Sequence, residues 1–267
     1  MSTKKTSGGF PLIVSALAIV ICILIGVFIF KNILGAPSNF DGGDPDKGHP
    51  HNMLGTMYKG GFIVPILMGL LLTTITFAIE RFITIMKASG KGNTDKFVAK
   101  IKTLISTHDF DGAIAECDIQ KGSLANVVHE GIVKYQFVQG DTTMDKEEKV
   151  AAIQKGLEEA TSLELPMLSK NMVVISTMAS IGTLAGLIGT VVGMIRAFSA
   201  LSAAGAPDTS ALATGISEAL VNTLVGILTS ACAIIFYNYF SNRIDQITYA
   251  MDEAGYSIVK EFQTSGK

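Results

Sequence analysis

The sequence predicts an all-α, polytopic membrane protein with four transmembrane helices and long helices that extend into a helical cytoplasmic domain. Two observations carry this prediction. The 267 residues are 48% hydrophobic and only 16% charged, against roughly 25% charged in soluble domains, and their mean hydropathy is +0.43. Four apolar runs are also long enough to cross a bilayer, for which about 20 residues suffice. The high apolar content excludes a disordered chain, and the net charge of -2 gives no support to nucleic-acid binding.

The first apolar run, residues 10–30, contains no charged residue and would be about 30 Å long as a helix. It is too long for the apolar part of a cleaved signal peptide, so we expect an extra N-terminal anchor after a cytoplasmic tail, residues 1–9. A periplasmic loop rich in Gly, Asp, Pro and His follows over residues 31–61. His49 and His51 could hold a metal weakly, but a polar loop stiffened by proline is favoured, and no metal site is predicted.

The rest of the chain alternates between apolar and polar segments. Lysine and arginine near the ends of the apolar runs favour a cytoplasmic N-terminus. In the largest polar segment, apolar residues recur at helical spacing, and the stretch from Met144 to Pro166 predicts one helix that continues into the third span. The predicted segments are a transmembrane helix (62–79), a helical cytoplasmic domain (80–170), a transmembrane helix (171–195), a periplasmic link (196–215), a transmembrane helix (216–240) and a cytoplasmic C-terminal helix (241–267).

Four glycines of the third span share one helix face. Gly182, Gly186, Gly189 and Gly193 follow one another at steps of three or four residues and include two GxxxG pairs. Because glycine lets helix backbones approach closely, we expect this face to pack against another helix and to mediate self-association.

Hydroxyl groups recur at steps of seven residues along the third and fourth spans. The two lines are Ser176, Thr183 and Thr190, and Thr223, Ser230 and Tyr237. Two matching lines predict one shared, partly hydrated path. Alternatively, each hydroxyl could bond to a carbonyl of its own helix or join neighbouring helices.

Glu218 is the acidic residue of the fourth span. A carboxylate near the bilayer interior costs about 2.5 to 3.5 kcal/mol, which favours a functional group that faces the protein interior. Glu218 also shares a helix face with Asn222 and Thr229. Alternatively, it reaches external water or pairs with a neighbouring subunit. Arg196, at the outer end of the third span, either sets the electrostatics of a channel mouth or extends to the lipid headgroups, and the second is favoured.

The sequence predicts neither an enzyme nor a cofactor. No HExxH, Ser/His or paired-Asp arrangement occurs in the spans, and the polar domain has no phosphate-binding loop. Cys22, Cys117 and Cys232 are scattered without CxxC spacing, which predicts no disulfide framework and no zinc site.

Two motifs in the third and fourth spans resemble the paired signature of the ExbB/TolQ/MotA proton-channel subunits and are most similar to ExbB. They are GLIGTVVGM over 186–194 and EALVNTLVG over 218–226, accompanied by Tyr237-Asn238 and by Glu80-Arg81. The resemblance covers roughly residues 60–252. It implies that residues 171–195 and 216–240 line a pore, with Thr190 and Thr223 at its pore-lining threonines and Glu218 at its acidic position. It supplies no role for residues 10–30.

The resemblance implies a proton-channel subunit of an inner-membrane motor in bacteria. In that family an oligomeric ring, a pentamer, surrounds the transmembrane helices of an ExbD-like partner that carries a carboxylate, and proton flow drives TonB-dependent transport at the outer membrane. The implied partners are therefore an ExbD-like subunit, a TonB-like protein, further copies of this chain and membrane lipid. Threonine hydroxyls neither gain nor lose a proton at physiological pH, so proton transport by this chain needs a partner with a titratable group. TolQ-like envelope maintenance, a motility stator and a non-conducting scaffold are the alternatives.

Overall fold

The computed structural model describes residues 10–202 and 209–265, and every regular element within them is a helix. Four of these helices are long and apolar enough to cross a membrane, over Val14–Leu34, Val64–Ala88, part of Lys146–Ala200 and part of Leu212–Thr264. The prediction of an all-α protein with four such helices is therefore confirmed. The oligomeric ring stays a prediction.

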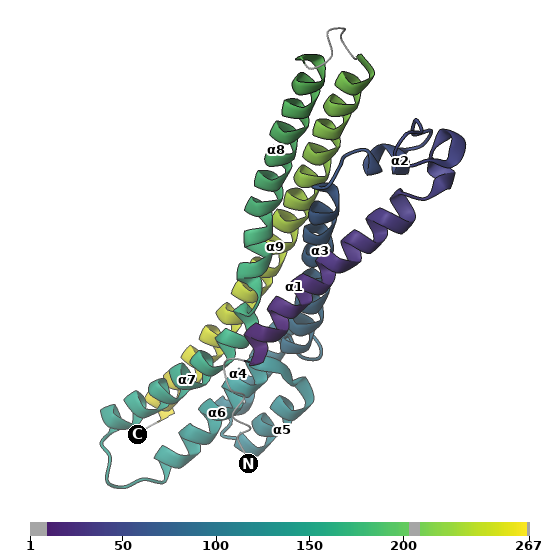
Figure 1. Ribbon diagram of the computed structural model, residues 1–267. Coiled ribbons are helices and arrows are strands. Elements are labelled where there is room, and N and C mark those ends of the chain that lie inside the picture. Colours follow the sequence, from purple (N-terminus) through teal and green to yellow (C-terminus); the bar gives the residue numbers. More distant parts are fainter. Residues whose placement is uncertain (1–9, 203–208, 266–267) are drawn as a thin grey trace. The chain divides into compact units, whose positions relative to one another are not determined.

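The chain divides into two units. Unit 1 contains the described residues up to Ile79 together with Val173–Tyr237, and unit 2 contains Glu80–Met172 and the described residues from Asn238 onward. The helices, drawn in Figure 1, are α1 (Phe10–Ile29), α2 (Met53–Tyr58), α3 (Val64–Ala88), α4 (Thr94–Ser106), α5 (Phe110–Gln120), α6 (Gly122–Gln139), α7 (Lys146–Ser169), α8 (Met172–Ser202) and α9 (Thr209–Ser265). Short π and 3-10 turns cover Phe30–Leu34, Pro37–Asn39 and Asp41–Gly43.

In unit 1, α1 crosses α3 (Figure 1), and one glycine of each helix lies at the crossing. A Cβ atom added at Gly26 would lie 2.6 Å from the Pro65 carbonyl oxygen, and one added at Gly69 would lie 2.7 Å from the Ile23 Cα. The two backbones therefore touch at the crossing, as small residues allow in membranes. Beside it, the Cys22 sulfur lies 3.6 Å from the Thr76 hydroxyl oxygen. The extra N-terminal span thus has a defined partner in this chain.

The α1–α3 crossing predicts a cross-link. In a Thr76→Cys variant, oxidation should join Cys22 to the new thiol, because the two side chains already touch. Adding Gly26→Leu should abolish the cross-link, since its side chain would meet the backbone of α3. Non-reducing gel mobility after partial proteolysis measures the link. Equal cross-linking with and without Gly26→Leu would contradict this packing.

Residues 30–61 form a folded loop rather than a plain polar connection. Asn39 is buried, and its amide donates to the carbonyls of Ile33 and Leu34 at 2.7 and 2.9 Å, which holds the end of the π-helical turn. The Tyr58 ring stacks on Phe30 at a centroid distance of 4.7 Å. Both contacts therefore fold the loop back onto the π-helical turn Phe30–Leu34 that follows α1.

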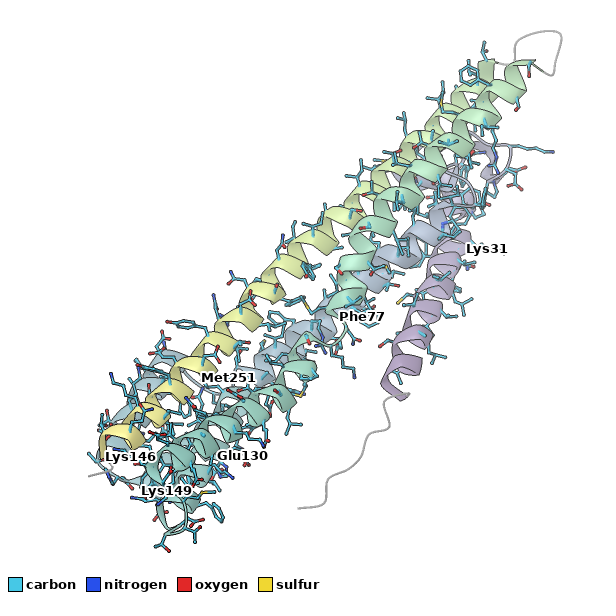
Figure 2. All side chains as sticks on the ribbon, turned by 90° about the vertical axis from the view of Figure 1, so that its left-hand side faces the viewer. Lys31, Phe77, Glu130, Lys146, Lys149 and Met251 are labelled. Atoms are coloured by element: carbon cyan, nitrogen blue, oxygen red, sulfur yellow. The ribbon has the colours of Figure 1, made fainter. Side chains whose placement is uncertain are left out.

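Unit 2 is a helical domain with an apolar core. Buried residues recur at helical spacing in α4 and α6, as the sequence predicts. Tyr135 of α6 lies at the centre, with ring centroids 4.8 Å from Phe110 and 4.9 Å from Phe262 of α9. Figure 2 labels Glu130 on α6, Lys146 and Lys149 at the beginning of α7, and Met251 on α9. Helix α7 begins with a capping box formed by Asp145 and Glu148.

The junction of α7 and α8 corrects one prediction, because the long helix does not continue into the third span. Helix α7 passes through Pro166 but ends at Ser169, and Asn171 adopts a left-handed φ of 61° before α8 begins. The buried Arg81 guanidinium donates to the Met167 and Leu168 carbonyls at 3.1 and 3.2 Å. These bonds satisfy the carbonyls that a helix end leaves open, and so stabilise the break.

Helix α9 runs without interruption from Thr209 to Ser265. The sequence separates a span, 216–240, from a C-terminal helix, 241–267, because the composition changes from apolar to charged there. A change of polarity alone does not end a helix, and no proline or glycine follows Phe240 until Gly255. One continuous helix therefore supplies both segments.

Cys117 of α5 should be unreactive. Burial, with smaller contributions from Asp118 and Glu116, raises the pKa of its thiol from 9.0 to about 12. The reactive thiolate would then be about one part in ten thousand at pH 8, rising tenfold per pH unit. Iodoacetamide should modify Cys117 slowly and the exposed cysteine of an Ile119→Cys variant quickly, as followed by mass spectrometry. Equal rates at the two positions would contradict the buried thiol.

Candidate functional site

The glycine face of α8 packs against α9 of the same chain. The two helices run antiparallel side by side in unit 1 (Figure 1). An added Cβ at Gly189 would lie 2.4 Å from the Asn222 Cβ, and one at Gly193 would lie 2.9 Å from the Ala219 nitrogen. Gly182 and Gly186 similarly face the Gly226 backbone. This corrects the expectation of a self-association face, because the glycines are already covered within one chain.

The hydroxyl lines of α8 and α9 meet at two levels. The Thr190 and Thr223 hydroxyls are hydrogen-bonded to each other. Seven residues away on each helix, the Thr183 and Ser230 oxygens are 2.7 Å apart. Each hydroxyl of the first pair also lies within hydrogen-bond distance of a carbonyl of its own helix, Thr190 of Gly186 at 3.2 Å and Thr223 of Ala219 at 3.1 Å. Because two hydroxyls carry only two protons, one threonine donates to the other while the second donates to its own carbonyl. The Thr190 and Thr223 hydroxyls thus each have two polar neighbours.

The remaining member of the α8 line behaves differently. The Ser176 hydroxyl donates to the Val173 carbonyl of its own helix at 3.0 Å. This is the alternative interpretation of the spacing, in which a hydroxyl satisfies a local carbonyl. The structure therefore joins Thr183, Thr190, Thr223 and Ser230, and places Ser176 outside that set.

Glu218 pairs with Arg196 across the α8–α9 contact. The Arg196 Nη1 donates to the Glu218 Oε1 at 2.7 Å, and the carboxylate side chain is only 7% exposed. The Arg196 side chain is half exposed, and its Cζ atom lies 5.2 Å from the centroid of the Phe62 ring. This corrects the favoured interpretation of Arg196, which extends to a carboxylate rather than to the headgroups.

The beginning of α3 completes the surroundings of this ion pair. Gly61 has a φ of 78°, and an added Cβ there would lie 2.1 Å from the Glu218 Oε1. The buried Asn222 amide donates to the Gly60 carbonyl at 3.0 Å. Sequence reasoning missed Gly60, Gly61 and Phe62. The Gly-Gly dipeptide before the second span was the available signal, because it marks a position of close backbone approach.

A groove of about 660 Å³ opens beside the threonine pair. It follows one side of α8 from Thr190 to Ser202, and exposed apolar side chains form most of its walls: Val191, Ile195 and Phe198. Thr190 presents a hydroxyl at one end of the groove and Ser199 and Ser202 do so at the other, while the apolar walls between them are suited to an apolar helix or to lipid.

The described residues offer little to a metal ion. No group of three His, Cys, Asp or Glu side chains gathers among residues 10–202 and 209–265. The His51 Nδ1 lies 3.6 Å from the Asp41 Oδ1 on the surface of the 30–61 loop. This arrangement is a single surface contact.

Comparisons with known proteins find relatives of the segment that contains the glycine face and the hydroxyl lines. Residues 121–253 match the model of the MotA/TolQ/ExbB proton channel family. The chain is 38% identical over 102 residues to an ExbB-like biopolymer transport protein of Synechocystis, covering 37% of this chain and 49% of that protein. It is 37% identical over 100 residues to the Tol-Pal system protein TolQ of Haemophilus influenzae, covering 36% and 44%. It is 26% identical over 194 residues to the biopolymer transport protein ExbB of Pseudomonas putida, covering 70% and 56%.

The chain spans about half the length of the curated relatives it matches. Relatives of both the ExbB and the TolQ kind are present, so the comparisons do not separate these two roles. Together with the four apolar helices, the matches indicate a multi-pass membrane protein. Through residues 121–253, about half of its length, this chain belongs to the MotA/TolQ/ExbB proton channel family.

Proposed function

We propose that this protein is the proton-channel subunit of an ExbB–ExbD-like motor in the bacterial inner membrane. The motor converts proton motive force into work for TonB-dependent transport at the outer membrane. In this proposal the chain surrounds an ExbD-like subunit with a transmembrane carboxylate, as a homo-oligomeric ring that is pentameric in the family. A TonB-like protein receives the work. The N-terminus lies in the cytoplasm.

The observation that carries the proposal is the pair of hydroxyl contacts between α8 and α9. Thr190 meets Thr223, and Thr183 meets Ser230, one heptad apart within two apolar helices. A hydroxyl can accept one proton and donate another, so such a row supports proton relay without storing charge. Glu218 supplies a carboxylate one to two turns from Thr223 on the same helix.

The groove beside Thr190 is a suitable binding site for the transmembrane helix of the ExbD-like partner. Its apolar walls suit a transmembrane helix, and the half-buried Thr190 hydroxyl would meet a carboxylate carried by that helix. A proton crossing the membrane contributes about 2.3 kcal/mol per 100 mV. That energy does work only if the partner moves when its carboxylate binds and releases a proton.

TolQ-like envelope maintenance is the second candidate, because a TolQ protein is among the relatives above 35% identity. The same hydroxyl path would serve it, and only the partners would differ.

Deleting the gene in its native host and restoring it from a plasmid tests the proposal. We expect loss of energy-dependent uptake across the outer membrane, with recovery on complementation and co-purification of a small single-span protein carrying an Asp or Glu in its span. Detergent sensitivity without an uptake defect would favour the TolQ-like role. A phenotype that does not depend on proton motive force would favour the non-conducting scaffold.

A further inference from the structure

A cavity of about 620 Å³ with charged side chains in its lining lies in unit 1 between the 30–61 loop and the facing ends of α8 and α9. Its size would hold on the order of 20 water molecules at about 30 Å³ each. Charged and titratable side chains come from all three elements: Asp46, Lys47, His49 and Lys59 from the loop, Arg196 from α8 and Glu218 from α9. These charged groups make the cavity suited to water and to ions.

The ion pair lies at the inner limit of the cavity. Glu218 and Arg196 both line it, and the Glu218 side chain is nearly buried while the Arg196 side chain is half exposed. Gly61 lets the carboxylate approach the beginning of α3, because an added Cβ would lie 2.1 Å from the Glu218 Oε1. The loop that follows the extra N-terminal span thus helps to build the surroundings of the acidic residue.

Polar atoms continue inward from the ion pair. Asn222 lies one turn from Glu218 on α9, and its Oδ1 is buried without a hydrogen-bond partner among the described residues. The next residue, Thr223, contacts Thr190. A series of polar groups therefore leads from the cavity to the threonine pair.

We propose that this cavity is the outer entrance of the proton path and that Arg196 is its specificity-determining residue. Arg196 leaves the Glu218 carboxylate available to protons but not to sodium or potassium ions. The inference rests on the proposed proton-channel function and gives the extra N-terminal segment a role in it.

The chemistry of the ion pair explains the discrimination. A metal cation needs net negative charge and several oxygen ligands, and the guanidinium occupies one carboxylate oxygen and cancels the charge. A proton needs only one lone pair. It forms an O–H bond on a Glu218 oxygen as the guanidinium moves aside, and it leaves that oxygen for the next acceptor, so nothing but the proton is transferred. The Phe62 ring provides a second contact for the cation.

Ion selectivity tests the role of Arg196. In vesicles that contain the complex purified from the native host, wild-type proton flux should be equal in sodium and choline salts. In an Arg196→Gln complex, sodium should lower the flux about tenfold, the size expected when one neighbouring charge is removed. Lys31→Gln is the control, because Lys31 is an exposed cation that does not line the cavity. Equal flux of Arg196→Gln in both salts would overturn the assignment.

Accessibility tests the entrance without relying on flux. Ser217 lines the cavity and is half-buried, so a Ser217→Cys variant should react in intact cells with a charged thiol reagent that cannot cross the membrane. Ala219 is 2% exposed, and Ala219→Cys should not react. If the Ser217→Cys chain is inserted and assembled but stays unlabelled, the proposal that the cavity is the outer entrance is wrong. A wild-type complex without proton flux would instead overturn the proposed function, and the labelling result would still decide whether the cavity is open.

Discussion

Replacing either threonine of the central pair with valine should abolish the energised activity of this protein. Thr190→Val and Thr223→Val keep the side-chain shape and remove the hydroxyl, so proton relay between α8 and α9 would be broken. We expect energy-dependent uptake to fall by about a hundredfold or more, the lower range for a positioned proton-transfer group. Folding should change little, because one lost hydrogen bond costs about 1 kcal/mol.

Thr177→Val is the matched control for this prediction. Thr177 is exposed on the same helix, and its hydroxyl donates only to the Val173 carbonyl among the described bonds, so its removal should leave uptake unchanged. Thr190→Ser should retain much of the activity, since it keeps the hydroxyl. Uptake measured in cells with equal amounts of membrane-inserted protein compares the variants. Full activity of both valine variants would favour a non-conducting scaffold over a proton channel.

The second large effect concerns the contact between α8 and α9. Gly189→Leu should separate the two helices, because a Cβ atom alone would lie 2.4 Å from the Asn222 Cβ. Overpacking of this kind costs about 1–3 kcal/mol or more. The displaced Asn222 would also lose its bond to the Gly60 carbonyl. We expect a clearly lower thermal aggregation temperature in detergent and loss of activity.

A cysteine pair reports this separation directly. Thr190→Cys with Thr223→Cys should form a disulfide, because the two hydroxyls are in contact, and Gly189→Leu should prevent it. Ser180→Leu is the control, since Ser180 is exposed on α8 and has room for a larger side chain. Undiminished cross-linking and stability in Gly189→Leu would show that the glycine face does not pack on α9.

Much of the fold could be predicted from the sequence because it depends on local patterns. An apolar run of about 20 residues predicts a membrane-crossing helix by itself, and the seven-residue spacing of Thr183 and Thr190 and of Thr223 and Ser230 predicts that each pair shares a helix face. The glycine spacing in α8 likewise predicts a close helix contact. The spacing carries no information about which helix makes that contact, so the sequence does not predict that α9 is the partner.

Contacts between distant segments could not be predicted in this way. Arg196 and Glu218 are 22 positions apart on different helices, and their pairing depends on how α8 returns as α9. Gly61 and Asn39 act through the fold of the 30–61 loop, whose composition alone predicts only a polar connection. The break after Ser169 depends on Arg81, which is distant in sequence.

Proton flux through the purified complex tests the central claim most directly. The chain and its native partners, reconstituted in vesicles with a pH-sensitive dye inside, should carry protons under an imposed membrane potential. The account predicts that Thr190→Val and Thr223→Val abolish this flux while Thr177→Val conducts like the wild type. Wild-type flux in both Thr190→Val and Thr223→Val would contradict a proton path through the α8–α9 hydroxyls.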